Sequence, residues 1–324
     1  MCTRVLWNDH ELAIVTGRSM DWPTTTQPKL TALPRGITRD GGIVSGQRLF
    51  AENPLTWTSK YGNVITSIYG IGCIDGMNEQ GLGGHGLYLA ACDFGARDVS
   101  RPGVHGGLWL QYALDNAATV AEAVDLLADV QIVAVEAHGH RSNLHLALAD
   151  ASGDSAVIEV LDGVTHIHRG REHTIMTNDP TYDEQLALLA ELDFSEPSRD
   201  MPLPGNVNAR DRFQRAAYYR ALLPEPTNQR EAVAGVLAIV RNCSVPFGAP
   251  YGEFGVYNTE YRTVVDHTNL RYFFELTTSP NVLWVDLAQL DLSDGAPCRV
   301  LDPDDIQLSG EVSGHMVALS APPF

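Results

Sequence analysis

Cys2 directly follows Met1, and the possible chemistry of this sequence centres on it. If Met1 is removed, Cys2 carries a thiol and a free α-amine on one Cα, so a nucleophile and its own general base lie side by side. In model compounds an α-amine and a thiol titrate at about pH 8 and about pH 8.5, so a proton can pass between them near neutrality. Alone, a cysteine is more often a small buried hydrophobic residue, because its reactivity depends on its surroundings.

Arg18 and Asp21 are the charged residues that the local sequence brings near Cys2. Thr3–Asn8 and Glu11–Gly17 have the pattern of a hairpin, and this pairing places Arg18 opposite Cys2. The guanidinium would then stabilise a thiolate by charge attraction. Asp21, just beyond the strand end, could accept a hydrogen bond from the Cys2 amine and orient it. The alternative is an ordinary surface ion pair, which contributes little stability.

The composition describes a folded protein with an acidic surface. The 324 residues include 40 acidic and 22 basic side chains, for a formal charge of −18. This balance argues against nucleic acid or an anionic membrane as a partner, because both bind basic patches. The five cysteines are odd in number and widely spaced, so reduced thiols are expected and neither a disulfide framework nor a zinc site is indicated.

Two His-x-His pairs, at 138–140 and 166–168, are the only clustered histidines. A metal site needs further ligands that the sequence does not place, so we interpret both pairs as structural and expect no metal.

No apolar run has the length of a membrane-spanning helix, and Asp9, His10 and Glu11 stand where a signal peptide would need an apolar core. The sequence as written therefore predicts a cytoplasmic protein. A protein whose signal peptide had been removed, and which is periplasmic, would look the same.

The remaining sequence predicts one domain over residues 1–324, because the Pro- and Gly-rich stretches at 195–208 and 244–255 do not separate segments of different composition. Strands are expected at Val64–Ile71, Gly86–Ala90, Asn143–Ala149, Ser155–Leu161, Val164–His168, His173–Thr177, Glu260–Asp266, Leu270–Leu276 and Val282–Leu287. Helices are expected at Leu108–Asn116, Val120–Asp129, Tyr182–Leu192, Arg210–Leu222 and Arg230–Asn242. This order predicts an α+β fold, in which two antiparallel sheets form a sandwich flanked by helices.

Several motifs, in order, resemble one known family. They are Met-Cys-Thr-Arg at 1–4, Gly-Arg-Ser-Met-Asp-Trp at 17–22, Asp-Gly-Met-Asn-Glu-Gln-Gly-Leu at 75–82, Gly-Leu-Tyr at 86–88, Thr-Asn-Asp-Pro at 177–180, Leu-Pro-Gly at 203–205 leading to Arg-Phe at 212–213, Gly-Ala-Pro at 248–250 and Thr-Glu-Tyr-Arg-Thr at 259–263. Together they resemble the choloylglycine hydrolase family of N-terminal-nucleophile hydrolases, which includes bile salt hydrolases and penicillin V acylases. The resemblance implies the four-layer αββα sandwich of that family.

The resemblance also implies a role for each matched residue. Cys2 would be the nucleophile, Arg18 the partner of its thiolate and Asp21 the carboxylate that orients the amine. Arg212 would stabilise charge within the site. On a polar helix face it would otherwise be an ordinary solvated charge.

Asn178 and Tyr88 would form the oxyanion site, through the Asn178 side-chain amide and the Tyr88 backbone N–H. Each donor of this kind typically contributes about 10²–10³ in rate. Bile salt hydrolases typically carry Asn at the position of Tyr88, whereas penicillin V acylases carry Tyr, so the match favours an aromatic or aliphatic acyl amide. Trp22 could form an aromatic wall for the acyl group, although a buried tryptophan is more often part of a core.

The expected activity is therefore cofactor-free hydrolysis of a small linear N-acyl amide, through an acyl-enzyme on Cys2. Bile salts and N-acyl homoserine lactones are alternative substrates. The short stretch between Asn178 and Arg212 resembles the Gram-negative branch of the family, some members of which cleave such lactones. An alternative of a different class is a non-catalytic binding protein that keeps Met1. The resemblance further implies a homo-oligomer, which is a tetramer in the family.

Overall fold

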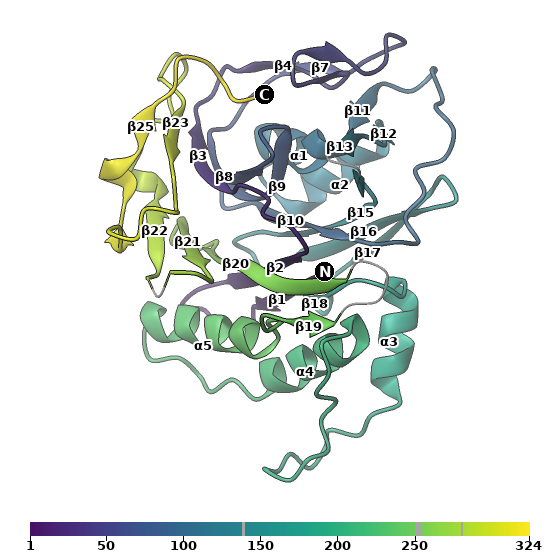
Figure 1. Ribbon diagram of the computed structural model, residues 1–324, viewed down its shortest axis with the longest axis vertical. Coiled ribbons are helices and arrows are strands. Elements are labelled where there is room, and N and C mark those ends of the chain that lie inside the picture. The colour runs from purple at the N-terminus through teal and green to yellow at the C-terminus, as the bar shows by residue number, and fades with distance from the viewer. Residues whose placement is uncertain (138–139, 251–254, 280) are drawn as a thin grey trace.

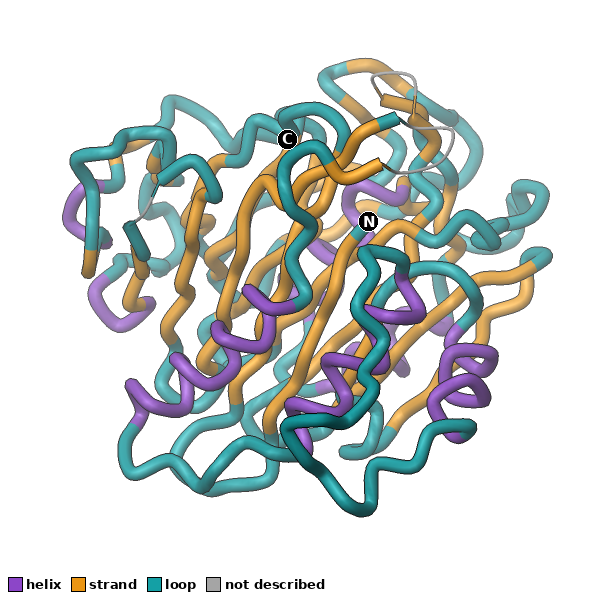
Figure 2. Tube along the Cα trace, turned by 60° about the horizontal axis from the view of Figure 1, so that its bottom comes forward, coloured by secondary structure: helices purple, strands orange, loops and turns teal. Residues whose placement is uncertain are grey.

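Two β-sheets lie face to face at the centre of the molecule, and helices cover the outer face of each (Figure 1). The computed structural model describes residues 1–137, 140–250, 255–279 and 281–324. Figure 2 looks towards the helices below the first sheet and shows them lying over its strands. The layers therefore follow the order helix, sheet, sheet, helix, as the expected αββα sandwich requires.

The first sheet carries the N-terminus near one edge. In spatial order its strands are β18 (Ile175–Met176), β1 (Cys2–Trp7), β2 (Val15–Trp22), β20 (Val256–Asp266), β21 (Arg271–Leu276), β22 (Leu283–Asp286) and β24 (Gly310–Glu311), with β19 (Ala249–Pro250) paired to β20. Its outer face is covered by α4 (Ala209–Ala221) and α5 (Gln229–Asn242), and α3 (Tyr182–Ala190) packs beside α4.

The second sheet supplies the opposite wall of the sandwich. Its order is β17 (Val164–Arg169), β16 (Ser155–Leu161), β15 (Leu144–Ala149), β10 (Gly83–Tyr88), β9 (Gly72–Asn78), β8 (Asn63–Ile68), β3 (Lys29–Leu33), β23 (Arg299–Leu301) and β25 (Val317–Ala318). The helices α1 (Trp109–Asn116) and α2 (Val120–Ala128) pack on its outer face.

Short ribbons complete the fold outside the two large sheets. They are β4 (Thr38–Asp40) with β7 (Thr56–Thr58), β5 (Ile43–Val44) with β6 (Gln47–Arg48), β11 (Gly103–His105) with β12 (Gln131–Val133), and β13 (Glu136–Ala137) with β14 (His140–Arg141). Short 3₁₀ turns lie at η1 (Gly106–Leu108), η3 (Leu287–Gln289) and η4 (Ser313–His315). Among the described residues, no helix combines the length and the apolar character that crossing a bilayer requires.

Side-chain spacing explains how the helices attach to the sheets. Val233, Val236 and Val240 recur at three- and four-residue intervals on α5 and are buried towards the first sheet. Gly17 on β2 permits this close approach, because a Cβ there would come within 2.6 Å of Val236. Gly76 on β9 likewise allows α1 to approach closely. Glycine is also a weak strand signal, so this strand was not predicted from the sequence.

The first hairpin differs from its predicted register. Cys2 lies opposite Met20, and Arg18 lies opposite Arg4, so the prediction that Cys2 pairs with Arg18 is wrong by two residues. The connection between the strands is longer than predicted, because Ile14 hydrogen-bonds outside the hairpin. Its N–H donates to Thr268 Oγ1 at 2.9 Å, and its carbonyl accepts from the His267 N–H at 2.9 Å, both in the turn that follows β20. A shift of two residues keeps every side chain on its original face.

Candidate active site

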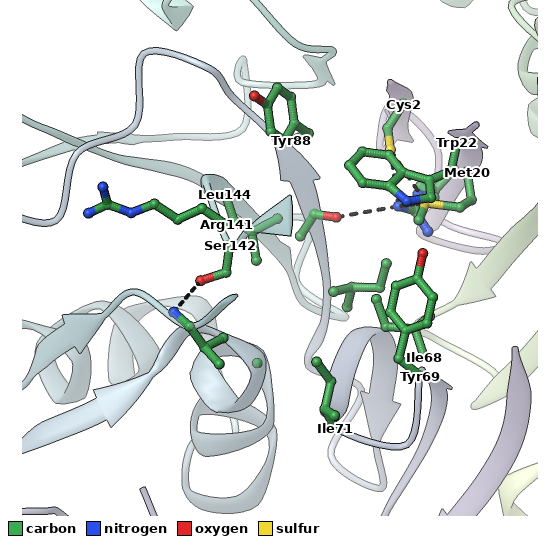
Figure 3. Close-up of a pocket in the computed structure, with 16 residues that line it drawn as sticks. Cys2, Met20, Trp22, Ile68, Tyr69, Ile71, Tyr88, Arg141, Ser142 and Leu144 are labelled. Carbon is green, nitrogen blue, oxygen red and sulfur yellow. Dashed lines mark hydrogen bonds between the residues drawn. The ribbon is translucent and has the colours of Figure 1, made fainter. Parts of the chain in front are cut away.

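Cys2 begins β1 and is buried, with its side chain facing the space between the two sheets. Its Sγ accepts a hydrogen bond from Arg18 Nη2 at 3.1 Å, and Met20 Sδ lies 3.7 Å away. Figure 3 shows Cys2 beside Met20 and Trp22 on one side of a cavity. The contact with Arg18 therefore survives the corrected register as a diagonal contact within one face of the hairpin.

Arg18 is fully buried and bridges the two sheets. Its guanidinium forms an ion pair with Asp75 on β9 and donates to Tyr261 Oη at 2.9 Å, and Tyr261 donates to Asp75 at 3.1 Å. Burial alone would lower the pKa of Arg18, but the charge of Asp75 outweighs it and raises the pKa well above its ordinary value. Arg18 is therefore a fixed cation with a second partner that the sequence did not reveal.

Asp21 follows a bulge in β2 and is fully buried. Its carboxylate accepts from Thr259 Oγ1 at 2.5 Å and lies 3.6 Å from Arg212 Nη1. Its backbone pairs with Met1, because the Asp21 N–H donates to Met1 O at 2.8 Å and the Met1 ammonium donates to Asp21 O. Burial lowers the pKa of this Met1 amine. Asp21 thus lies beside the chain end, and its contact with a Cys2 amine stays a prediction for the chain without Met1.

Asn178 links the chain end to β10. Its Oδ1 accepts from the Cys2 N–H at 2.7 Å and from Arg212 Nη2 at 2.9 Å, while its Nδ2 donates to the Tyr88 carbonyl at 2.6 Å. Two donors on one side and a carbonyl on the other fix which atom is nitrogen. One N–H of the Asn178 amide therefore faces Tyr88, an arrangement that the sequence prediction did not include.

Arg212 extends from α4 to the first residues of β1 and has no exposed surface. It donates to the Cys2 carbonyl, to Thr3 Oγ1 at 2.5 Å and to Val207 O at 2.8 Å, in addition to Asn178. A guanidinium with this many acceptors rigidly positions the peptide that carries Cys2. The alternative of a solvated surface charge does not apply.

A largely apolar cavity opens in front of Cys2. Trp22 forms part of its wall, and the centroid of its ring lies 5.9 Å from that of Tyr88. A role for Trp22 in binding the acyl group stays a prediction. The other described lining residues are Arg18, Met20, Ile68, Tyr69, Ile71, Gly72, Ile74, Gly86, Gly107, Val135, Arg141, Ser142 and Leu144. This lining suits an apolar acyl group placed against the thiol.

The sequence prediction also missed a buried histidine–carboxylate contact behind Asn178. His145 on β15 has Nε2 2.8 Å from the Thr177 carbonyl and Nδ1 2.9 Å from Glu159 Oε1. Each ring nitrogen therefore lies within hydrogen-bond distance of an oxygen atom. Burial alone would raise the pKa of Glu159, but the bonds from His145 and from the Tyr182 N–H lower it. A lone buried histidine in an apolar strand was the only sequence signal of this clamp.

The histidine pairs show no metal-binding arrangement where the structure describes them. His166 and His168 lie on β17, whereas His138 falls outside the described residues. Within the described part of the chain, no three His, Cys, Asp or Glu side chains gather as possible metal ligands.

Comparisons with a protein-family model and with known proteins point to the same family. The family described as linear amide C–N hydrolases, choloylglycine hydrolase family, matches residues 2–305. The chain is 38% identical to the penicillin V acylase of Pectobacterium atrosepticum, over 97% of this chain and 89% of that protein. It is 24% identical to a bile salt hydrolase/transferase of Bifidobacterium longum, over 72% of this chain and 78% of that protein.

Solved structures agree with these sequence matches. The penicillin V acylase of Agrobacterium tumefaciens superposes with a TM-score of 0.88 at 40% identity, covering 99% of this chain and 98% of that one. A variant of the conjugated bile acid hydrolase of Clostridium perfringens superposes with a TM-score of 0.79 at 20% identity, covering 96% and 98%, and shares the fold. The expected family and sandwich fold are confirmed. This chain belongs to the choloylglycine hydrolase family of linear amide C–N hydrolases.

Proposed function

We propose that this enzyme hydrolyses N-acyl amides of the penicillin V type, with Cys2 as the nucleophile. The observation that carries the proposal is the position of Cys2 Sγ, which lies 3.1 Å from Arg18 Nη2 at the head of an apolar cavity. A thiolate is the reactive form of cysteine, and a fixed cation in contact with the sulfur favours it.

Removal of Met1 is the first requirement of this mechanism. An acylated nitrogen cannot accept a proton, so the Cys2 nitrogen becomes a base only when the preceding residue has left. Met1 and its amine are buried, and burial lowers the pKa of that amine. Burial of the same kind would lower the pKa of a free Cys2 amine and so favour the neutral form that can take the thiol proton.

The two chemical steps then share one oxyanion site. The thiolate attacks the amide carbon, and the oxygen accepts hydrogen bonds from the second N–H of Asn178 Nδ2 and from the Tyr88 backbone N–H. The Cys2 ammonium returns its proton to the leaving nitrogen as the C–N bond breaks. Water, deprotonated by the same amine, hydrolyses the thioester and frees Cys2. Arg212 would hold Asn178 and the Cys2 carbonyl in register throughout.

The apolar lining and Tyr88 support a phenoxyacetyl-like or aliphatic acyl group over the acyl group of a bile salt. The relatives named penicillin V acylase are more similar to this chain than those named bile salt hydrolase. The test is a side-by-side assay of penicillin V, glycocholate and a long-chain N-acyl homoserine lactone with the mature enzyme. We expect the highest kcat/KM for penicillin V. A preference for glycocholate would contradict the inference that Tyr88 favours an aromatic or aliphatic acyl group over a bile acid.

A further inference from the structure

Met1 fills an apolar site beside the nucleophile, and the mechanism above needs Met1 to leave. Its side chain packs with Ala209 on α4, Val245 after α5 and Tyr257 on β20, and Trp22 lies at the edge of this cluster. Only 6% of Met1 is exposed. We call the space that Met1 occupies among Ala209, Val245 and Tyr257 the Met1 site. Its lining suits one apolar side chain about as large as that of methionine.

The backbone of Asp21 forms a polar side of the Met1 site. Its N–H donates to the Met1 carbonyl at 2.8 Å, and its carbonyl accepts from the Met1 ammonium. Asp21 has no exposed surface. Both groups lose their partner when Met1 leaves, whereas buried backbone groups in proteins are almost always paired. The Met1 site therefore offers a new occupant one N–H donor and one C=O acceptor, next to apolar side chains.

The leaving nitrogen of the substrate must come to the same place. In the proposed reaction it takes its proton from the Cys2 amine, so the two nitrogens must approach to about 3 Å. The Cys2 nitrogen donates its hydrogen to Asn178 Oδ1 at 2.7 Å, and its bond outside its own residue runs to the Met1 carbonyl carbon. Loss of Met1 thus opens the direction from which the leaving nitrogen can approach.

Trp22 lies between the Met1 site and the cavity in front of Cys2. The centroid of its ring is 5.9 Å from that of Tyr88, which lines the cavity, and 6.4 Å from that of Tyr257, which lines the Met1 site. Cys2 stands where the two spaces meet, because it lines the cavity and its nitrogen is bonded to Met1. The two spaces therefore suit the two halves of an amide, the acyl group and the amine.

We propose that the Met1 site, once Met1 has left, binds the leaving amine of the substrate and selects an α-amino acid with an apolar side chain. The carbonyl next to the amine-bearing carbon accepts from the Asp21 N–H, in place of the Met1 carbonyl. The apolar side chain of the amino acid takes the space of the Met1 side chain. The inference rests on the proposed function, since it takes Cys2 as the nucleophile and its amine as the proton donor.

The test compares two substrates that share a phenoxyacetyl group and differ only in the leaving amino acid, which is L-methionine or glycine. Mass spectrometry first verifies that each enzyme preparation begins at residue 2. We expect kcat/KM for the methionine compound to exceed that for the glycine compound by about tenfold or more, because burial of an apolar side chain contributes on this scale. Equal values, or a preference for the glycine compound, would overturn the inference.

Two substitutions on α4 provide a matched pair of variants. Ala209→Leu places a larger side chain in the Met1 site, so the ratio of the two kcat/KM values should fall towards one. Ala221→Leu makes the same change at the exposed last residue of the helix and should keep the ratio of the unsubstituted enzyme. If Ala209→Leu keeps that ratio as well, the methionine side chain binds elsewhere and the inference is overturned.

Binding without turnover separates this inference from the proposed function. Cys2→Ala, freed of Met1, has no thiol to attack either compound, so calorimetry can measure both dissociation constants. We expect the methionine compound to bind about tenfold more tightly than the glycine compound. This preference in an enzyme that hydrolyses neither compound would support the Met1 site while the proposed function fails. Hydrolysis of both compounds with equal affinities would support the proposed function and overturn the inference.

Discussion

Replacing Asn178 by Ala should remove most of the activity and also destabilise the fold. The substitution deletes three hydrogen bonds, to the Cys2 N–H, to Arg212 and to the Tyr88 carbonyl. The buried N–H and C=O left behind cost about 1–3 kcal/mol each, and the unpaired Arg212 nitrogen adds to this. Loss of one oxyanion donor lowers kcat by about 10²–10³, or roughly 2.7–4 kcal/mol of transition-state stabilisation, with little change in KM.

Asn78 offers a matched control for this substitution. It is also a buried asparagine, and its Nδ2 donates to Leu114 O at 2.9 Å and Ala117 O at 2.7 Å, on the far side of the second sheet from Cys2. Asn78→Ala should destabilise the protein by a similar amount but leave kcat within about threefold. Steady-state kinetics with penicillin V and urea unfolding measure the two effects separately. If Asn178→Ala keeps kcat as Asn78→Ala does, Asn178 is only structural, and the oxyanion role is refuted.

Three further predictions concern the cavity and the buried histidines. Trp22→Ala should raise KM for a phenoxyacetyl amide by about tenfold with little effect on kcat, because an aromatic wall is lost; an unchanged KM would place the acyl group elsewhere. Leu144→Trp should fill the cavity and lower kcat/KM for long acyl chains more than for an acetyl amide, and equal losses would contradict this. Burial lowers the pKa of His105 to about 4, below the unfolded value, so stability falls as the pH drops from about 6.5 towards 4, by about 2 kcal/mol at pH 5. His105→Gln should therefore lose less stability than the unsubstituted protein between pH 7 and pH 5 in urea unfolding.

Local patterns predicted the helices well and the strands less evenly. The three- and four-residue spacing of apolar side chains located all five predicted helices to within about two residues. The β9 strand was missed because Gly72 and Gly76 have low strand propensity. Glycine is needed at these positions because η1 and α1 pack closely against them. The hairpin register was wrong, because Ile14 bonds to a turn about 250 residues away in the sequence.

The residues chosen for the site do gather around Cys2, but their partners could not be read from the sequence. Asp75 and Tyr261 lie in motifs that supported the family resemblance. Asp75 reaches Arg18 only because the two sheets face each other, and Tyr261 reaches it from the neighbouring strand β20. His145 is a single histidine in an apolar strand, and its role follows only from Glu159 on the neighbouring strand β16. The single domain and the homo-oligomer stay predictions.

Mass spectrometry of the enzyme during turnover tests the central claim most directly. The purified protein is mixed with penicillin V and quenched in acid. The masses of the intact protein and of its N-terminal peptide are then measured. The account predicts a chain that begins at Cys2 and a phenoxyacetyl group bound to that residue through a thioester, which is absent from Cys2→Ala. A chain that turns over substrate while retaining Met1, or an acyl group on any other residue, would contradict it.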